Sequence, residues 1–172
     1  MEEDVKIPEE RIAVLIGENG SIKRKIARET KTSITVDSHT GDVLIEGEGE
    51  SFFKARDIVK AIGRDFSPER AFNLLKEDYL LKIIEIPEFT GKNASAQKAR
   101  RGRVIGRHGE ARKEIEKKTN SFISVHGKTV AIIAKVADLE KAIEAVKILL
   151  QGSSHETMEN FLERKGKTRF EL

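Results

Sequence analysis

Gly106, Arg107, His108 and Gly109 form a short run whose residue types suit the binding of a phosphate backbone. Glycine has no Cβ, so the backbone of a ligand can approach a Gly-x-x-Gly turn closely. The arginine and histidine between the two glycines can donate hydrogen bonds to phosphate oxygens. A helix that begins directly after such a turn has unpaired first amides, which favour an anion. The run therefore predicts an anion-binding turn at the start of a helix.

The same spacing occurs 89 residues earlier, at Gly17, Glu18, Asn19 and Gly20. The chain has 13 glycines, enough to give about one Gly-x-x-Gly by chance. The residues that follow each loop carry more weight, because isoleucine, threonine, isoleucine and valine recur at matching offsets. They are Ile26, Thr30, Ile34 and Val36 in the first copy and Ile115, Thr119, Ile123 and Val125 in the second. The chain thus contains an internal repeat.

Each copy predicts a helix that ends at the loop, a second helix that begins after it, and a strand. In the first copy the second helix covers about residues 21–30, and the strands cover about residues 33–37 and 42–46. Thr30 and Thr119 close the second helices. With a strand before and a strand and helix after, the order is β-α-α-β-β-α. This is the arrangement of a type I KH domain, in which the Gly-x-x-Gly loop holds the backbone of about four nucleotides.

A length of 172 residues fits two small domains that can each form a core. We predict an α+β fold, with two type I KH domains in tandem and a short connecting helix. In each domain a three-stranded antiparallel sheet packs against the helices. The predicted segments are residues 1–66 for the first KH domain, 67–79 for the connecting helix, 80–152 for the second KH domain and 153–172 for a C-terminal helix and tail.

Three helices have distinctive sequences. The third helix of the first domain has an apolar stripe of Phe53, Ile58, Val59, Ile62 and Phe66. The connecting helix begins with a cap residue, a proline and an acid at residues 67–69. An insertion at residues 90–101 lengthens the helix before the second loop. Gly102 lies inside that helix at a cost of up to about 1 kcal/mol, which a close approach of backbone or RNA would explain.

The net charge is only +3, but it is distributed unevenly. Residues 92–118 contain ten Lys and Arg against three Glu, whereas residues 1–31 contain seven of each sign. Positive charge therefore gathers around the second loop, where it would attract phosphate. A solvated charged face is the alternative explanation of such a run.

Composition excludes several classes of protein. There is no cysteine, hence no disulfide or thiolate metal site, and no apolar run reaches the length of a membrane span. The acidic start, Met1 to Asp4, is unlike a signal peptide. We expect a cytoplasmic protein without membrane contact. The high charge, together with few Asn and Gln, resembles the composition of thermophile proteins.

Catalytic motifs fail on spacing. Two Gly-Lys-Thr triplets, at residues 127–129 and 166–168, lack the glycine that a P-loop needs five residues earlier. The four histidines are far apart and have no metal-ligand spacing, and there is no nucleophile elbow. We therefore expect no catalytic residues, no metal and no cofactor.

RNA binding remains, with roles for individual residues. Arg107 and His108 would donate to phosphates at the second loop, whereas Glu18 at the tip of the first loop repels phosphate. We expect the first loop, with Asn19 beside Glu18, to bind RNA more weakly or to contact protein. Further candidates are Lys23 and Arg112 at equivalent helix positions, Lys113, Arg101 and Arg103 before the second loop, and Ile16, Ile34, Ile105 and Ile123 as an apolar floor under the bases or as plain core.

The second loop with its flanks, Gly102 to Gly109 followed by Ala111 and Arg112, resembles the second KH domain of the partner-of-Nob-one (Dim-two) family. Residues 66–71 between the domains are similar to archaeal members of that family. The resemblance implies a ribosome-assembly factor that binds the 3′ region of the small-subunit rRNA precursor and assists the endonuclease that matures this end. It also implies RNA contacts at residues 106–109. Eukaryotic members lack the first Gly-x-x-Gly, which this chain keeps.

A second class of function stays open. The KH surfaces could instead dock proteins, such as the maturation nuclease or translation factors, so that the chain acts as an adaptor. A narrower alternative is a KH protein of RNA decay or transcription. Binding of single-stranded RNA, and its loss with salt, would separate an RNA-binding protein from an adaptor.

Overall fold

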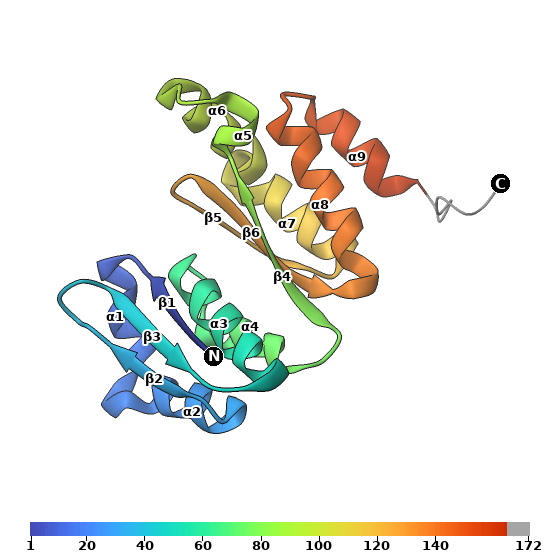
Figure 1. Cartoon of the computed structure of the whole chain (residues 1–172). Coiled ribbons are helices and arrows are strands. Elements are labelled where there is room, and N and C mark those ends of the chain that lie inside the picture. Colours follow the sequence, from blue (N-terminus) through green and yellow to red (C-terminus); the bar gives the residue numbers. More distant parts are fainter. Residues whose placement is uncertain (165–172) are drawn as a thin grey trace. The chain divides into compact units, whose positions relative to one another are not determined.

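The computed structural model describes residues 1–164, which fold as two β-α-α-β-β-α units (Figure 1). The chain divides between Leu81 and Lys82 into two compact units. Each unit has a three-stranded sheet, with strand orders β1-β3-β2 and β4-β6-β5. The predicted α+β fold with two KH domains is confirmed. The end of the predicted tail, residues 165–172, lies outside the described residues.

The first unit has its helices on one face of its sheet (Figure 1). Val5, Val43 and Ile45 point from the strands to these helices and are buried. Pro8 immediately precedes the first helix, which ends where Gly17 turns to a positive φ. The elements are β1 (Glu2–Lys6), α1 (Glu9–Ile16), α2 (Ser21–Thr30), β2 (Ser33–Val36), β3 (Asp42–Glu46) and α3 (Gly49–Gly63).

In helix α3 the prediction was wrong for one core residue. Phe52 is buried with an exposed fraction of 2%, whereas Phe53 is 43% exposed. The Phe53 ring lies edge-on to that of Phe52 and under the guanidinium of Arg56, 4.9 Å from its Cζ. The residue inside the stripe is therefore Phe52, which lies on the same helical face as Ile62.

The segment after α3 begins a helix at the predicted place. α4 (Pro68–Ala71) is capped by Ser67, whose Oγ accepts a hydrogen bond from the amide of Arg70 at 3.2 Å. A 3₁₀ turn (Phe72–Leu75) follows, and both pack against α3. Lys54 of α3 donates to the carbonyl of Leu75 at 3.0 Å, which ties the turn to the first unit.

The second unit repeats the first with additions. Its elements are β4 (Tyr79–Glu85), α5 (Pro87–Thr90), α6 (Ala94–Ile105), α7 (Glu110–Thr119), β5 (Phe122–His126), β6 (Thr129–Lys135), α8 (Val136–Leu150) and α9 (His155–Glu163). Helix α6 has 12 residues where α1 has 8, so the insertion does lengthen the helix before the second loop. Helix α9 covers the core with Met158 and Leu162, both buried. No helix in residues 1–164 is long and apolar enough to cross a membrane.

The second helix of each unit ends with the same hydrogen bonds. Thr119 donates from Oγ1 to the carbonyl of Ile115 at 2.6 Å and lies 2.7 Å from the hydroxyl of Ser121. Thr30 makes the same two contacts, at the same distances, with Ile26 and Thr32. Both threonines are buried. A buried hydroxyl thus joins the end of each helix to the start of the next strand.

Candidate nucleic-acid interface

The two glycine loops have the same backbone conformation. The first glycine, Gly17 or Gly106, has φ of 74° and ψ of 175°. The third residue is left-handed, with φ of 54° at Asn19 and 55° at His108. Each loop leads directly into the next helix, α2 or α7. The repeat in the sequence is therefore a repeat of backbone geometry.

The first glycine of each loop is required by packing. An ideal Cβ on Gly106 would lie 2.6 Å from the Cβ of Ala111, and one on Gly17 would overlap the side chain of Ile22. Their φ and ψ also lie in a region that only glycine adopts readily. A Cβ on Gly109 would meet only side-chain ends, at 3.8 Å or more. The first glycine thus lets the loop lie against the following helix, a reason that the sequence did not reveal.

The tip of the second loop is open. The side chains of Arg107 and His108 are exposed and have no hydrogen bond or ion pair with any residue in the described part of the chain. Helix α7 begins without a side-chain cap, so none of its first amides is taken by a capping side chain. Glu18 and Asn19 are equally exposed, and α2 is uncapped as well. Both loops can meet an anion, but only the second has basic side chains at its tip.

Two predicted cations near the second loop have partners within the protein. Arg101 donates to the carbonyl of Gly127 at 3.0 Å, in the turn between β5 and β6. Arg103 donates to the carbonyl of Ser153 at 3.1 Å, just after α8. Each guanidinium keeps further donors, but both side chains join α6 to other elements. Lys113 is exposed, and its Cε is 3.8 Å from the Cβ position of Gly109, so it lies beside the loop.

One further cation of α7 is paired with the last helix. The Nζ of Lys118 is 2.9 Å from Oε1 of Glu163, and this hydrogen bond raises the pKa of Lys118 above its ordinary value. Lys117, by contrast, is exposed and has no partner among residues 1–164. Lys118 therefore ties α7 to α9, which leaves Lys117 as the unpaired cation of the described residues in the last turn of α7.

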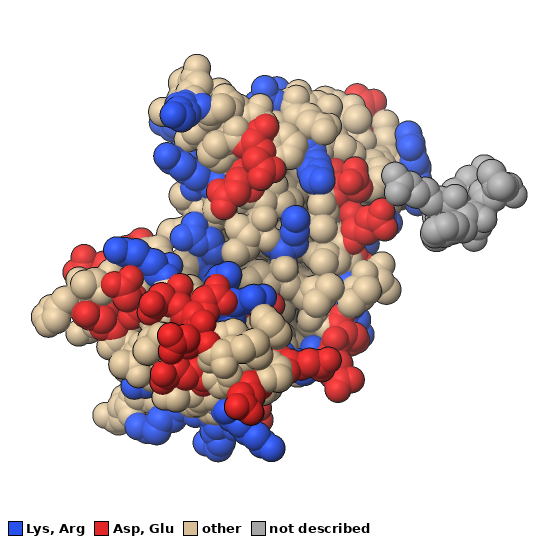
Figure 2. Space-filling view, viewed as in Figure 1, with Lys and Arg blue, Asp and Glu red and all other residues tan. Residues whose placement is uncertain are grey.

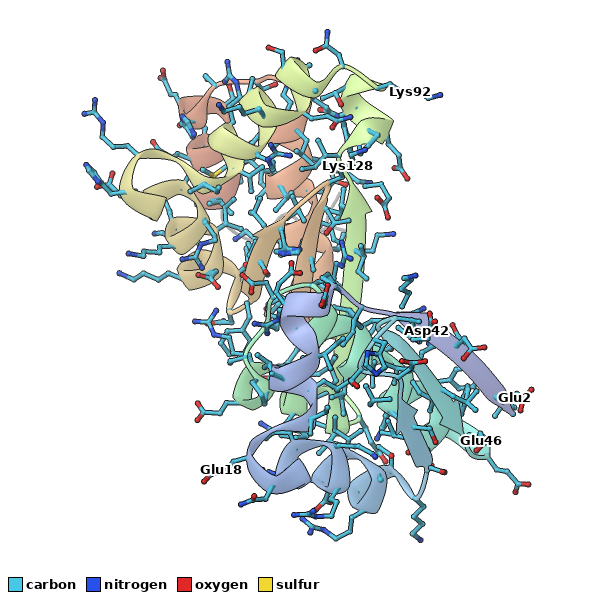
Figure 3. All side chains as sticks on the ribbon, turned by 90° about the vertical axis from the view of Figure 1, so that its left-hand side faces the viewer. Glu2, Glu18, Asp42, Glu46, Lys92 and Lys128 are labelled. Atoms are coloured by element: carbon cyan, nitrogen blue, oxygen red, sulfur yellow. The ribbon has the colours of Figure 1, made fainter. Side chains whose placement is uncertain are left out.

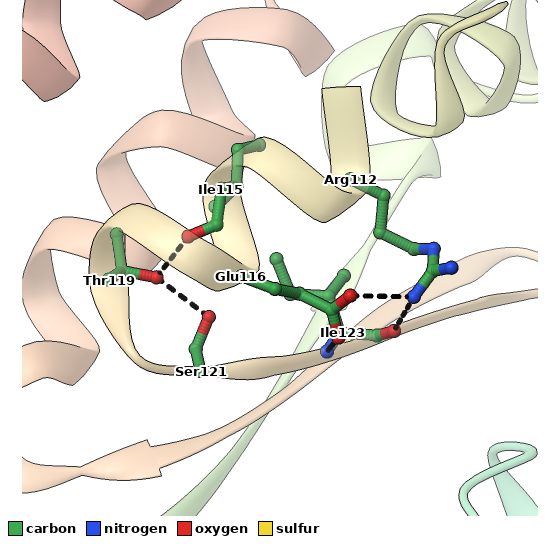
Figure 4. Close-up of polar contacts among 6 residues, drawn as sticks. All are labelled: Arg112, Ile115, Glu116, Thr119, Ser121 and Ile123. Carbon is green, nitrogen blue, oxygen red and sulfur yellow. Dashed lines mark hydrogen bonds and ion pairs between the residues drawn. The ribbon is translucent and has the colours of Figure 1, made fainter. Parts of the chain in front are cut away.

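Arg112 is held at the edge of the sheet by Glu116 (Figure 4). Its Nη1 is 2.8 Å from Oε1 of Glu116 and 3.5 Å from the carbonyl oxygen of Ile123. Oε2 of Glu116 accepts the amide of Ile123 at 2.9 Å. Strand β5 is an edge strand, so the pair satisfies polar groups that no neighbouring strand reaches. Sequence reasoning missed Glu116, although its i,i+4 spacing from Arg112 was visible.

The first unit differs at the matching positions. Lys23 stands where Arg112 does, and Ala27 stands where Glu116 does, so no such ion pair can form. Arg24, not singled out from the sequence, lies over the first loop, with Nη1 3.1 Å from the Cβ position of Gly20. The first loop thus has a guanidinium beside it, although its tip carries Glu18.

The predicted apolar floor is divided by burial. Ile34 and Ile123 are buried, at 5% and 2% exposure, and belong to the core. Ile105, the last residue of α6, is 37% exposed, and Ile16 is half-buried. Ile105 and Ile16 directly precede the loops. Of the four isoleucines, only Ile16 and Ile105 therefore have side chains that can contact a base, and the other two support the strands from inside.

The outer face of the first sheet is acidic. Figure 2 shows Asp and Glu side chains gathered over β1 and β3. Glu2 and Glu46 are directly paired across these strands, and Asp42 pairs with Lys6. In Figure 3, Glu2 and Glu46 project on the opposite side of this unit from Glu18 at the loop. The negative charge of these side chains would repel the phosphates of RNA from this face. The loop side is therefore left as the phosphate-binding surface of the unit.

Comparisons with known proteins agree with this geometry. Residues 80–167 match the family described as eukaryotic type KH-domain (KH-domain type I), in its model of the second KH domain of PNO1. Residues 2–61 match the KH domain family. The chain is 40% identical to the KH domain-containing protein MJ0443 of Methanocaldococcus jannaschii, over 99% of this chain and 78% of that protein.

Solved structures give the same result. Dim2p from Pyrococcus horikoshii is 48% identical, with 96% of this chain and 99% of that chain covered and a TM-score of 0.87. A complex of a/eIF2alpha, aDim2p and rRNA from the same organism matches at 47% identity, with 95% and 93% covered and a TM-score of 0.87. A protein of unknown function from Aeropyrum pernix matches at 37% identity, with 95% and 89% covered and a TM-score of 0.88. Two repeated glycine loops, and these matches over almost the whole length, establish that the chain belongs to the PNO1 (Dim2p) family of KH-domain proteins.

Proposed function

We propose that this protein binds single-stranded rRNA of the small ribosomal subunit, in its 3′ region, as a ribosome-assembly factor. The principal contact is the second loop, where Arg107 and His108 stand free beside the uncapped start of α7. The first loop, with Glu18 at its tip, contributes a weaker contact. The observation that carries the proposal is the open second loop, and the Pyrococcus complex of aDim2p with rRNA supports the choice of RNA.

The proposed RNA-binding surface includes the loops and the side chains that flank them. Lys113 and Arg112 lie on the loop side of α7, and Ile105 precedes the loop with an exposed apolar side chain. Arg101 and Arg103 stay at its margin, because each already donates to a carbonyl. In the first unit the surface consists of Gly17, Glu18, Asn19, Gly20 and Lys23.

Equilibrium binding to a short single-stranded RNA with the 3′ sequence of small-subunit rRNA tests the proposal. A scrambled oligonucleotide and a duplex of the same length are the controls. Each neutralised phosphate contributes about −0.7 to the slope of log K against log salt. About three phosphates at the second loop would therefore give a slope of about −2. Tight, salt-dependent and sequence-preferring binding is expected, and absence of binding to any single strand at physiological salt would refute the proposal.

We infer that binding to another protein is a second function of this chain. The Pyrococcus aDim2p forms a complex that contains a/eIF2alpha as well as rRNA. We propose that this chain likewise binds the α subunit of that translation factor, and that it acts with the endonuclease that matures the rRNA 3′ end. Co-purification of each candidate with the full chain, with and without RNA, separates an adaptor from an RNA-binding protein that needs no partner.

A further inference from the structure

The strongest unexplained feature of the second unit is the ion pair on the edge of β5. Arg112 and Glu116 together occupy both the amide and the carbonyl of Ile123, a buried residue of the edge strand (Figure 4). A nucleotide base that lay against this strand would find the amide of Ile123 already bonded and its carbonyl beside the guanidinium of Arg112. The side chain of Arg112 is therefore the group that such a base would meet here.

The first unit leaves the matching groups open. Asp37 donates its amide to Asp42 across the strands β2 and β3. Because bonded and non-bonded pairs alternate in an antiparallel ladder, the amide and carbonyl of Ile34 point away from β3. β2 is an edge strand, and no side chain among residues 1–164 bonds to these groups. The ion pair is therefore specific to the second unit, and its absence in the first gives an internal comparison.

The free donors of Arg112 lie beside the second loop. Among residues 1–164 its partners are Glu116 and Ile123, which both engage Nη1, and Nη2 is 4.0 Å from the Cβ position of Gly109. In Figure 4 the other two nitrogens of the guanidinium point away from Glu116 and Ile123. Each oxygen of Glu116 already accepts a hydrogen bond within the protein, so the groups that the pair has free for a ligand are chiefly the donors of Arg112. The side chain of Arg112 is 27% exposed, so a ligand can reach it.

We propose that Arg112, positioned by Glu116, selects guanine in RNA held at the second loop. Guanine offers two acceptors, O6 and N7, that match two donors of one guanidinium. Adenine and cytosine each carry an amino group, which would face these donors and be rejected. Arg112 is the residue that contacts the base, and Glu116 is a positioning residue. This proposal rests on the proposed RNA binding and adds to it a base preference at one nucleotide.

The test uses the full-length protein and short uridine oligomers that carry one central guanine, 7-deazaguanine, adenine or cytosine. Because the strand can slide, the single central base can reach the position beside Arg112. We expect the guanine oligomer to bind about tenfold more tightly than the others, including the 7-deaza form that lacks N7, since one bidentate pair discriminates by about that factor or more. This comparison needs no variant, so a folding failure cannot obscure it.

Three variants then assign the preference. Arg112→Lys keeps the charge but lacks the fork of two donors, so the guanine preference, measured against plain uridine for the same variant, should fall to about twofold. Glu116→Gln removes the ion pair and should also reduce the preference, because Arg112 is no longer held. Arg107→Ala, at the loop tip, should weaken all oligomers alike. A wild-type protein that binds every oligomer equally, or an Arg112→Lys variant that keeps the guanine preference, would overturn the proposal. A wild-type protein that binds the 3′ rRNA oligonucleotide but none of these oligomers would also overturn it, whereas one that binds neither would instead refute the proposed RNA binding.

Discussion

Gly106 and Ala111 are so close that an ideal Cβ on the glycine would lie 2.6 Å from the Cβ of the alanine. The loop therefore lies directly on the first turn of α7, and its backbone has a φ and ψ that side chains rarely adopt. The shape of the phosphate-binding turn is thus set by packing inside the protein. A ligand would find the loop already formed.

Gly106→Ala should consequently destabilise the second unit. The added methyl group combines backbone strain with a clash against Ala111, and we expect a loss of about 2 kcal/mol or more in the free energy of unfolding. Gly109→Ala is the matched control, because its Cβ would lie at least 3.8 Å from its neighbours in the described part of the chain. Its backbone is left-handed, so the alanine should cost about 1 kcal/mol in the free energy of unfolding. Urea denaturation measures both. Equal losses would show that the clash with Ala111 adds nothing to the change in the free energy of unfolding.

The buried hydroxyl of Thr119 supports a second prediction. Thr119→Val keeps the shape of the side chain but removes the hydrogen bonds to Ile115 and Ser121, and the Ser121 hydroxyl is itself buried. We expect a loss of about 1–2 kcal/mol in the free energy of unfolding.

Thr30→Val in the first unit is the comparison for this prediction. Its partner Thr32 is only half-buried, so water can replace the missing hydrogen bond and the cost should be smaller. Chemical denaturation of the two variants measures the difference. A larger loss for Thr30→Val than for Thr119→Val would contradict this account.

Much of this architecture could be predicted because the repeated residues determine local backbone geometry. Thr30 and Thr119 end their helices as expected, since the pattern of apolar residues and the glycine loops act over a few residues. Phe53 was assigned wrongly because two phenylalanines are adjacent. The helical period counted back from Ile62 favours Phe52, so the signal was present.

The side-chain partners around the second loop could not be predicted in the same way. Arg103 bonds to a carbonyl 50 residues away and Arg101 to one 26 residues away. The role of Glu116 depends on α7 lying across the edge of β5, where it reaches the amide of Ile123. Such interactions are properties of the folded domain, and spacing along the chain does not encode them.

Gly102 allows a prediction that separates stability from binding. It lies inside α6, and a Cβ there would meet no atom of residues 1–164 within 4 Å. Gly102→Ala should therefore raise the free energy of unfolding, by up to about 1 kcal/mol, because alanine favours the helix. If RNA approaches the helix at this point, the same variant should bind RNA less tightly. Thermal unfolding and RNA titration of one preparation measure both effects, and a variant that is more stable with unchanged affinity would exclude a close approach of RNA at Gly102.

The charge at the loop tips provides the sharpest comparison between the two units. Changing Arg107 and His108 to Asp removes two donors and adds repulsion, so affinity for single-stranded RNA should fall by at least about tenfold. The salt slope should become shallower by about 0.7 for each phosphate that the protein no longer neutralises. Changing Glu18 and Asn19 to Asp should have a much smaller effect, because the first loop already carries a negative tip.

The reciprocal exchange tests the same idea in the other direction. Replacing Glu18 by Arg and Asn19 by His gives the first loop the tip of the second, on a backbone with the same dihedral angles. Affinity should rise and the salt slope should steepen, because an uncapped helix start is already present there. Equal losses from the two Asp variants, or no gain from this exchange, would show that the difference between the two units does not arise at the loop tips. The ion pair of Arg112 and Glu116 would then be the principal distinction between them.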